Sequence, residues 1–426
     1  MVTPNCETET ILTQDADEST ISKTSSEGNC LSRLRRWFIV EPILILYVFG
    51  VFPVQTIAQK YILHRITNES LHILTSQNIS DHPTNTTFDP CHSNTSDPIY
   101  QFQEYVQSKS SQFVLYESII NGVPAIFVTI ILGAGSDIFG RRFAILPPLV
   151  GALLGSSIYT YVICTEASIH WLFVGDAVIG CCGSFYAVLM GCLAYVADRT
   201  PPEKLMIRIT IIELTMFIPG VISPIVCGKV TTAFGYLIPL LFIIAASAVN
   251  LVYALIFLPN ETKGSKELHV STAESLPECP SSTERSSCFS VLSLLWIRIC
   301  SMVTLFTDKS ASTDADVRCG RMRLNLLIAS FFVTKIPVAL YDVSKKTLFM
   351  MNSPLCWDLD MIGLFSGVTF AVSGVGAIIV TPLFKCCGIM EYVIAILAGL
   401  VCTATNVYTV FVKTTVMMFL SELFNR

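Results

Sequence analysis

The sequence predicts an all-α protein with many membrane-spanning helices. Its 426 residues are 52% hydrophobic and only 14% charged, and the mean hydropathy is +0.61. One soluble domain with a water-facing shell needs more charge than this. A helix of about 20 mostly apolar residues crosses a bilayer, and nine such segments occur along the chain. A bilayer is therefore the expected solvent.

The predicted spans are separated by polar connections. They cover residues 37–58, 113–135, 143–163, 171–196, 209–227, 236–258, 324–343, 361–384 and 392–412. Basic residues precede the first and seventh spans and follow the second and fourth, which places these ends in the cytosol by the positive-inside rule. An odd number of spans then places the end of the chain on the outer side.

The connections divide the chain into four expected parts. Residues 1–36 form a polar cytosolic tail, predicted to be disordered, since the first apolar run comes too late and is too long for a cleaved signal peptide. Residues 37–258 form a six-helix bundle with an external loop at 63–112. Residues 259–320 are a cytosolic linker, and 321–426 an incomplete second bundle. Within the linker, 289–306 is apolar around Arg298, which favours an interfacial helix over a tenth span.

Glycosylation signals support this orientation. The external loop 63–112 carries four N-glycosylation sequons, at Asn68, Asn78, Asn85 and Asn94. A fifth, at Asn260, falls on the cytosolic side and is expected to stay unmodified.

Composition also excludes several classes of function. The net charge of -5 provides no basic surface for nucleic acid. Most of the 16 cysteines lie within apolar runs, and none occurs with metal-ligand spacing. The sequence has no nucleophile and base, phosphate loop or metal cluster at catalytic spacing, so we expect neither an enzyme nor a cofactor.

A charged motif follows the second predicted span. Residues 133–142 read G-x-x-x-D-x-x-G-R-R, with Asp137, Gly140, Arg141 and Arg142 at the fixed positions. Gly140 permits a tight turn between two helices, and Asp198 after the fourth span is a plausible partner for either arginine. Charges at such a junction can pair differently in two conformations and so act as a latch. The alternative is that the arginines only orient the helices by the positive-inside rule, but this does not explain the aspartate and glycines at fixed positions.

The 133–142 motif resembles the loop signature of the major facilitator superfamily. The segments Glu41-Pro42, 195–198 leading to 211–213, and Pro354-Leu355-Cys356-Trp357-Asp358 are similar to the proton-coupled folate transporter family of solute carriers. This resemblance covers the chain from residue 37 onward, apart from the linker. The resemblance implies twelve helices, and the last three have no counterpart in this sequence. A truncated form of the carrier is therefore expected. The alternative is a partial carrier that needs a partner protein.

The resemblance assigns two further roles. Glu213 matches a fifth-helix glutamate that is implicated in proton coupling in the family. Burial in a membrane favours the neutral form of an acid, so that it can bind and release protons. The alternative is a glutamate near the inner membrane face whose side chain reaches water. Cys91 and Cys356 match a disulfide between the two halves, with free thiols as the alternative. The folate transporter also has a seventh-helix histidine, which residues 324–343 lack, so folate is not the expected substrate.

Three further charged residues are predicted to lie within the membrane. Lys335 is near the middle of the seventh span, where a cation needs water, a carboxylate or an anionic substrate. Glu117 and Asp176 lie in the outer parts of the second and fourth spans. All three residues are candidates for lining the substrate cavity. Two alternatives are equally consistent with the sequence: Lys335 forms an ion pair with Glu117 or Asp176, or the two acids take part in polar packing between helices. Kinks are expected at Pro219 and Pro337.

The combined expectation is a transporter of a small organic solute, possibly anionic, surrounded by membrane lipid. Proton symport by rocking of two halves is favoured, with the proton as the coupling ion. The alternatives are a non-transporting protein with an assembly or regulatory role and a drug/proton antiporter. The plasma membrane is the favoured location. An acidic pattern from Glu7 to Leu12, similar to a dileucine signal, makes the endolysosomal membrane the alternative.

Overall fold

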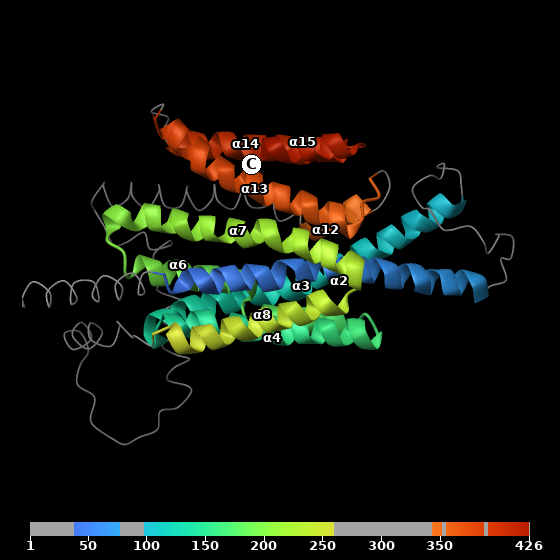
Figure 1. Cartoon of the computed structure of the whole chain (residues 1–426), viewed down its shortest axis with the longest axis horizontal. Coiled ribbons are helices and arrows are strands. Elements are labelled where there is room, and N and C mark those ends of the chain that lie inside the picture. The colour runs from blue at the N-terminus through green and yellow to red at the C-terminus, as the bar shows by residue number, and fades with distance from the viewer. Residues whose placement is uncertain (1–37, 77–97, 260–342, 352–354, 387–390, 426) are drawn as a thin grey trace, which may run out of the picture.

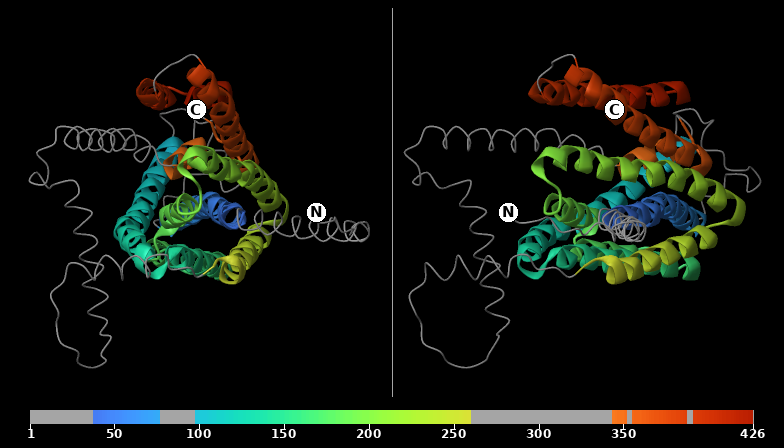
Figure 2. Two further views of the ribbon diagram at one scale, coloured as in Figure 1. Left: turned by 90° about the vertical axis from the view of Figure 1, so that its left-hand side faces the viewer. Right: turned by 60° about the vertical axis from the view of Figure 1, so that its left-hand side comes forward.

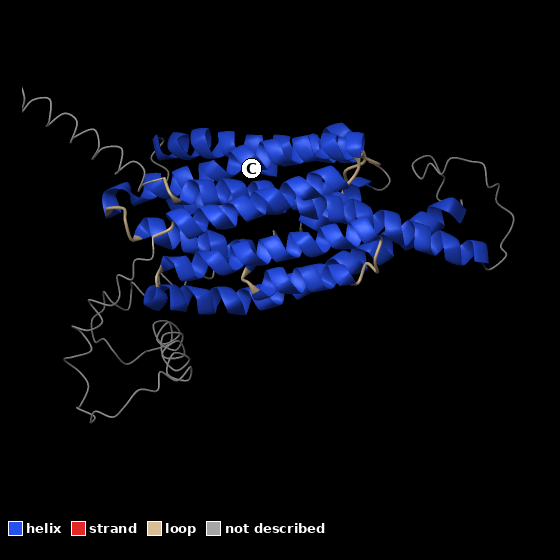
Figure 3. Ribbon diagram, turned by 60° about the horizontal axis from the view of Figure 1, so that its bottom comes forward, coloured by secondary structure: helices blue, strands red, loops and turns tan. Residues whose placement is uncertain are grey.

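The computed structural model describes residues 38–76, 98–259, 343–351, 355–386 and 391–425. Within these ranges every regular element is a helix (Figure 3), and seven stretches are long and apolar enough to span a membrane. The all-α membrane fold is thus confirmed, whereas the number of nine spans is not. Several predictions lie outside the described residues: the N-terminal tail, Asn78, Asn85, Cys91, Asn94, Asn260, the segment 289–306, Lys335 and Pro337 with the seventh span.

The helices form two groups that lie side by side (Figures 1 and 2). The first group contains α2 (Val40–Ser76), α3 (Pro98–Phe139), α4 (Arg141–Thr165), α5 (Trp171–Cys181), α6 (Ser184–Ala197), α7 (Pro202–Phe234) and α8 (Leu237–Phe257). The second contains α12 (Val343–Met351), α13 (Leu359–Cys386), α14 (Glu391–Val410) and α15 (Thr415–Asn425). Figure 2, seen along the helices, places α13 to α15 beyond α7. The sequence did not predict α15.

Both ends of the segment predicted as an external loop, residues 63–112, are helical. Helix α2 continues to Ser76 and α3 begins at Pro98. Neither extension contains a glycine or an internal proline that would end a helix, and Ile62, Ile66 and Val106 are buried where the two helices pack. Figures 1 and 3 show the extensions reaching past the other helices at one end.

The span predicted at 171–196 is interrupted. Helix α5 ends at Cys181 and α6 begins at Ser184. Gly183 between them has a φ of +97°, a left-handed conformation that only glycine adopts at low cost. The hydroxyl of Thr129 donates to the Gly183 carbonyl at 3.3 Å, which satisfies an acceptor near the break.

Two apolar clusters hold the first group together. One lies toward the cytosolic ends of α2, α4, α6 and α7, with Ile43, Leu44, Leu149 and Ile212 fully buried. The other lies toward the outer ends and is centred on residues such as Ile57, Ile62, Leu172, Leu240 and Ile243. Lipid does not drive helices together as water does, so this packing depends on close contact between complementary surfaces.

The two groups meet along a seam between α7 and α13. A Cβ atom added at Gly220 would lie 2.7 Å from the Phe370 ring, and one added at Gly367 would lie 2.8 Å from the Val221 carbonyl oxygen. Gly363 approaches the Pro224 carbonyl in the same way. Small residues let the two helix backbones come this close. The seam fixes how one group lies against the other.

Candidate functional site

The charged motif forms a network at the end of the first group that is predicted to face the cytosol. Arg141 lies 2.6 Å from Asp137 and 2.6 Å from Asp198, measured between guanidinium nitrogens and carboxylate oxygens, and it also donates to the Ser136 hydroxyl. Gly140 has a φ of +91°, so the turn before α4 needs a glycine. The structure therefore brings these motif residues together around one guanidinium.

Arg142 has a different partner from Arg141. Its Nη2 donates to the Leu255 carbonyl at 2.7 Å, near the end of α8. All of these contacts join helices of the first group, so the network braces that group in the present conformation. Its role as a latch between conformations stays a prediction.

A second ion pair of the first group is buried and was not predicted from the sequence. Arg208 Nη1 of α7 is 2.6 Å from Glu41 Oε1 of α2, and the two side chains are only 4% and 6% exposed. The guanidinium carbon also lies 4.9 Å from the centre of the Phe38 ring. The pair joins α2 to α7, and losing one partner would leave the other charge buried in a place where desolvation is costly.

Glu213 lies on the side of α7 that faces the second group. It is exposed, whereas the adjacent Ile212 is fully buried in the first group. Helical spacing places Glu213 in line with Phe217 and Gly220, which contact Gly374 and Phe370 of α13. The carboxylate is therefore one turn beyond the seam, toward the cytosolic end of α7.

Glu117 and Asp176 lie together between α3, α4 and α5. The Tyr159 hydroxyl donates to Asp176 at 2.9 Å, and the Asn121 amide lies 3.5 Å from the same carboxylate. Among the described residues, Glu117 Oε1 is buried without a hydrogen-bond partner. These acids therefore lie within the first group. Their role in a substrate cavity stays a prediction, as does that of Lys335.

Aromatic rings cross the boundary between the groups. Phe52 of α2 lies 5.8 Å from Phe185 of α6 and 5.6 Å from Phe370 of α13, measured between ring centres. Tyr47 is 6.0 Å from Phe185. Nothing in the sequence distinguishes these rings, because aromatic residues are common in its apolar segments.

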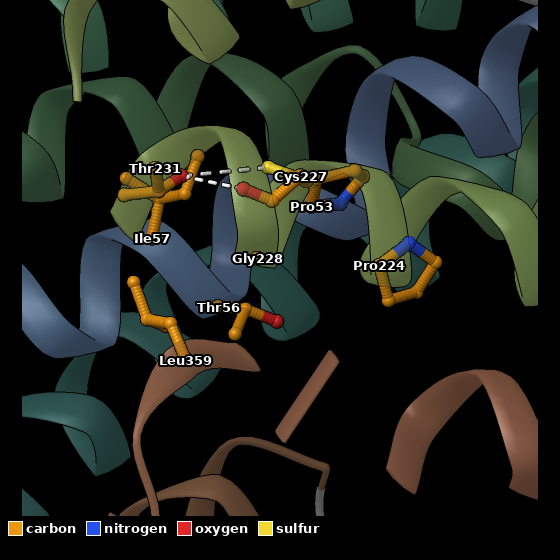
Figure 4. A pocket seen from close by; sticks show the side chains of 8 residues that line it. All are labelled: Pro53, Thr56, Ile57, Pro224, Cys227, Gly228, Thr231 and Leu359. Atoms are coloured by element: carbon orange, nitrogen blue, oxygen red, sulfur yellow. Dashed lines mark hydrogen bonds between the residues drawn. The ribbon is translucent and has the colours of Figure 1, made fainter. Parts of the chain in front are cut away.

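A small pocket lies at the outer part of the same boundary (Figure 4). Its lining comes from α2, α7 and α13, namely Pro53, Thr56, Ile57, Pro224, Cys227, Gly228, Thr231 and Leu359. The empty volume is about 230 Å³ even with open solvent included, below the roughly 300–1,000 Å³ of small-molecule sites. The pocket therefore marks where the groups close together and is too small for a drug-sized solute.

The segment around Trp357 joins α12 to α13. Cys356 is disulfide-bonded, and the cysteines at 164, 181, 182, 192 and 227 are free. The Trp357 ring is 7% exposed and packs on Phe365 and Phe419. The pairing of Cys356 with Cys91 stays a prediction.

Comparison with known proteins decides the family. The Major Facilitator Superfamily matches residues 110–424. The chain belongs to this superfamily. It is 30% identical over 392 residues to the human lysosomal proton-coupled steroid conjugate and bile acid symporter SLC46A3, covering 90% of this chain and 76% of the relative. It is 25% identical to the rat proton-coupled folate transporter, covering 76% of this chain and 61% of that protein.

Solved structures agree with this assignment. A peptide transporter POT in complex with sulfate superposes with a TM-score of 0.53 at 13% identity, over 91% of this chain and 78% of the other. At that identity the likeness shows the fold alone. The major facilitator chain described here is thus a multi-pass membrane protein whose relatives are transporters, and this confirms the expectation that it is not an enzyme.

Proposed function

We propose that this chain is a proton-coupled symporter of organic anions that works by rocking of its two helix groups. The position of Glu213 carries the proposal: the carboxylate lies on α7, one turn beyond the seam where the two groups meet. An acid at such a boundary can take up a proton in one conformation and release it in the other. Proton-coupled relatives support the same assignment.

The substrate class that we propose is an apolar ring system with a negative charge. The Phe52, Phe185 and Phe370 rings lie at the boundary and offer flat apolar surface. Steroid conjugates and bile acids, named for the human relative, combine such a body with an anionic group. A proton carried with the solute would offset part of its charge.

Uptake into liposomes tests this function. We would reconstitute the full chain and measure entry of a radiolabelled steroid sulfate with the outer buffer at about pH 5.5 or about pH 7.4. Faster uptake at the lower pH is expected, and Glu213→Gln should remove the difference. Glu203→Gln is the matched control, since Glu203 is exposed in the first turn of the same helix. Equal uptake at both pH values in the unaltered chain would exclude proton coupling.

The outer face should carry two modifications. We propose a disulfide between Cys91 and Cys356, supported by the bonded state of Cys356, and sugars at Asn68, Asn78, Asn85 and Asn94. Asn68 is exposed on the part of α2 that extends past the other helices. Peptide mapping without reduction, before and after glycosidase treatment, detects both.

The compartment is the endolysosomal membrane in this proposal, since the relatives named as symporters are lysosomal. The plasma membrane, which the sequence analysis favoured, is the alternative. Microscopy of the tagged chain distinguishes the two, and a double Ile11→Ala and Leu12→Ala variant should shift it to the cell surface if the N-terminal pattern is a sorting signal.

A further inference from the structure

Two polar contacts join the helix groups at their outer ends. Lys60 Nζ of α2 lies 3.3 Å from Asp358 Oδ1. The Thr232 hydroxyl of α7 lies 3.0 Å from Asp360 Oδ1. The two acids stand on either side of Leu359, at the start of α13. Since α2 begins in the cytosol by the positive-inside rule, these contacts are on the outer side of the membrane.

The backbones of α7 and α13 also approach each other closely at this point. Leu359 is 2% exposed, and a Cβ atom added at Gly228 would lie 2.7 Å from its carbonyl oxygen. Leu359 lines the small pocket together with Cys227 and Thr231 (Figure 4). The polar contacts therefore cover a place where solute entering from outside would have to pass between the groups.

The acids are held firmly on the second group. The Trp357 amide donates to the Met350 carbonyl at 2.8 Å, and its indole Nε1 donates to the Thr415 hydroxyl at 3.2 Å. These bonds fix the short segment before α13 against α12 and α15. Asp358 therefore moves with the second group when that group rocks.

The Lys60 and Asp358 contact suits a gate that must open repeatedly. The side chains are 33% and 76% exposed, so each charge regains water when the contact breaks and no unpaired charge stays buried. Exposed pairs of this kind are weak. A weak contact adjusts the balance between two conformations without trapping one of them.

We propose that Lys60 with Asp358, and Thr232 with Asp360, form the outer gate of the transport path. The proposal rests on the proposed function, because it assumes that the two groups move apart. The contacts hold the outer end closed, and they break when the path opens outward. Asp358 and Lys60 are positioning residues in this scheme, since they set the conformational balance and need not touch the solute.

The native Cys227 reports on this gate. It is a free, partly buried thiol that lines the pocket. We would treat intact liposomes containing the full chain with a membrane-impermeant thiol reagent and follow the Cys227 peptide by mass spectrometry. Lys60→Ala and Asp358→Asn should each raise its labelling rate, by about two- to fivefold given the strength of exposed pairs. Cys164, exposed near the outer end of α4, provides the internal standard.

Two further variants make the test specific. Exchanging the charges, with Lys60→Asp and Asp358→Lys together, should return the rate toward that of the unaltered chain. Glu166→Gln breaks the comparable 3.8 Å pair with Arg65, which lies within the first group, and should leave the rate unchanged. Unchanged labelling in Lys60→Ala and Asp358→Asn, or an equal rise in Glu166→Gln, would overturn the gate. Labelling needs no proton coupling, so this result is independent of the uptake experiment.

Discussion

The carboxylate of Glu41 and the guanidinium of Arg208 are both removed from water, and each is the charged partner of the other. Glu41→Gln would remove the carboxylate that faces the buried guanidinium. We expect a loss of about 3–5 kcal/mol in the free energy of unfolding. Thermal unfolding of the purified chain in detergent should show a clearly lower Tm.

An exposed pair provides the control for Glu41→Gln. Arg65 and Glu166 are 3.8 Å apart with side chains 32% and 78% exposed, so Glu166→Gln should cost about 1 kcal/mol at most. If the two variants had equal Tm values, burial of the Glu41 and Arg208 pair would not contribute to stability.

Asp198 carries a second prediction at this scale. Its two oxygens accept from Arg141 at 2.6 and 3.3 Å. Asp198→Asn removes the charge and should slow the maximal rate of uptake about tenfold, if exchange of this contact is part of the conformational cycle. Asp198→Glu keeps the charge and should retain more of the rate. A normal uptake rate in Asp198→Asn would show that the motif only stabilises the first group and takes no part in the conformational cycle.

The sequence indicated individual charged residues and one partner, Asp198 for Arg141, but it did not indicate the buried pair of Glu41 and Arg208. The motif spacing indicated Asp137 and Arg141, because the short turn at Gly140 brings the end of one helix close to the start of the next. Glu41 was noticed only as part of the Glu41-Pro42 segment, and Arg208 was not singled out among the basic residues that follow the fourth span. Their contact depends on how α2 packs on α7, and nothing local in the sequence specifies that packing.

At the scale of elements, apolar length located the spans but not the helix ends. The extension of α2 to Ser76 is too polar to count as membrane-spanning, yet it contains no residue that stops a helix. The break between α5 and α6 was not predicted, because the sequence around it looks like one continuous apolar helix. Residues 171–196 are mostly apolar on both sides of Gly183, and glycine within such a segment is common, so the positive φ of Gly183 could be found only from the structure.

The seam between α7 and α13 gives a prediction about elements. Gly363 lies against the Pro224 carbonyl, so a methyl group there must push the helices apart. We expect Gly363→Ala to lower the Tm and reduce uptake. Gly122 of α3 has nothing within 4 Å of an added Cβ, so Gly122→Ala should be neutral or raise stability by up to about 1 kcal/mol. Equal effects of the two changes would argue against close packing at the seam.

For the whole molecule, the sequence predicted the membrane fold because the apolar segments match the thickness of a bilayer. It also placed a boundary between two bundles in the polar segment after residue 258. It did not show which helices meet across that boundary. The structure assigns this contact mainly to α2, α7 and α13, where the aromatic cluster, the pocket and the Lys60 contact lie. Helix α12 also packs against α2 and α3.

A reversible cross-link across this boundary tests the central claim, that transport requires the two groups to separate. Cysteines would replace Thr232 and Asp360, whose side chains meet at 3.0 Å. Oxidation to a disulfide should abolish uptake of the labelled steroid sulfate, and reduction should restore it. The chain without these two cysteines would be treated in parallel to account for oxidation and reduction of native cysteines. Uptake at the full rate with the cross-link formed would contradict the account.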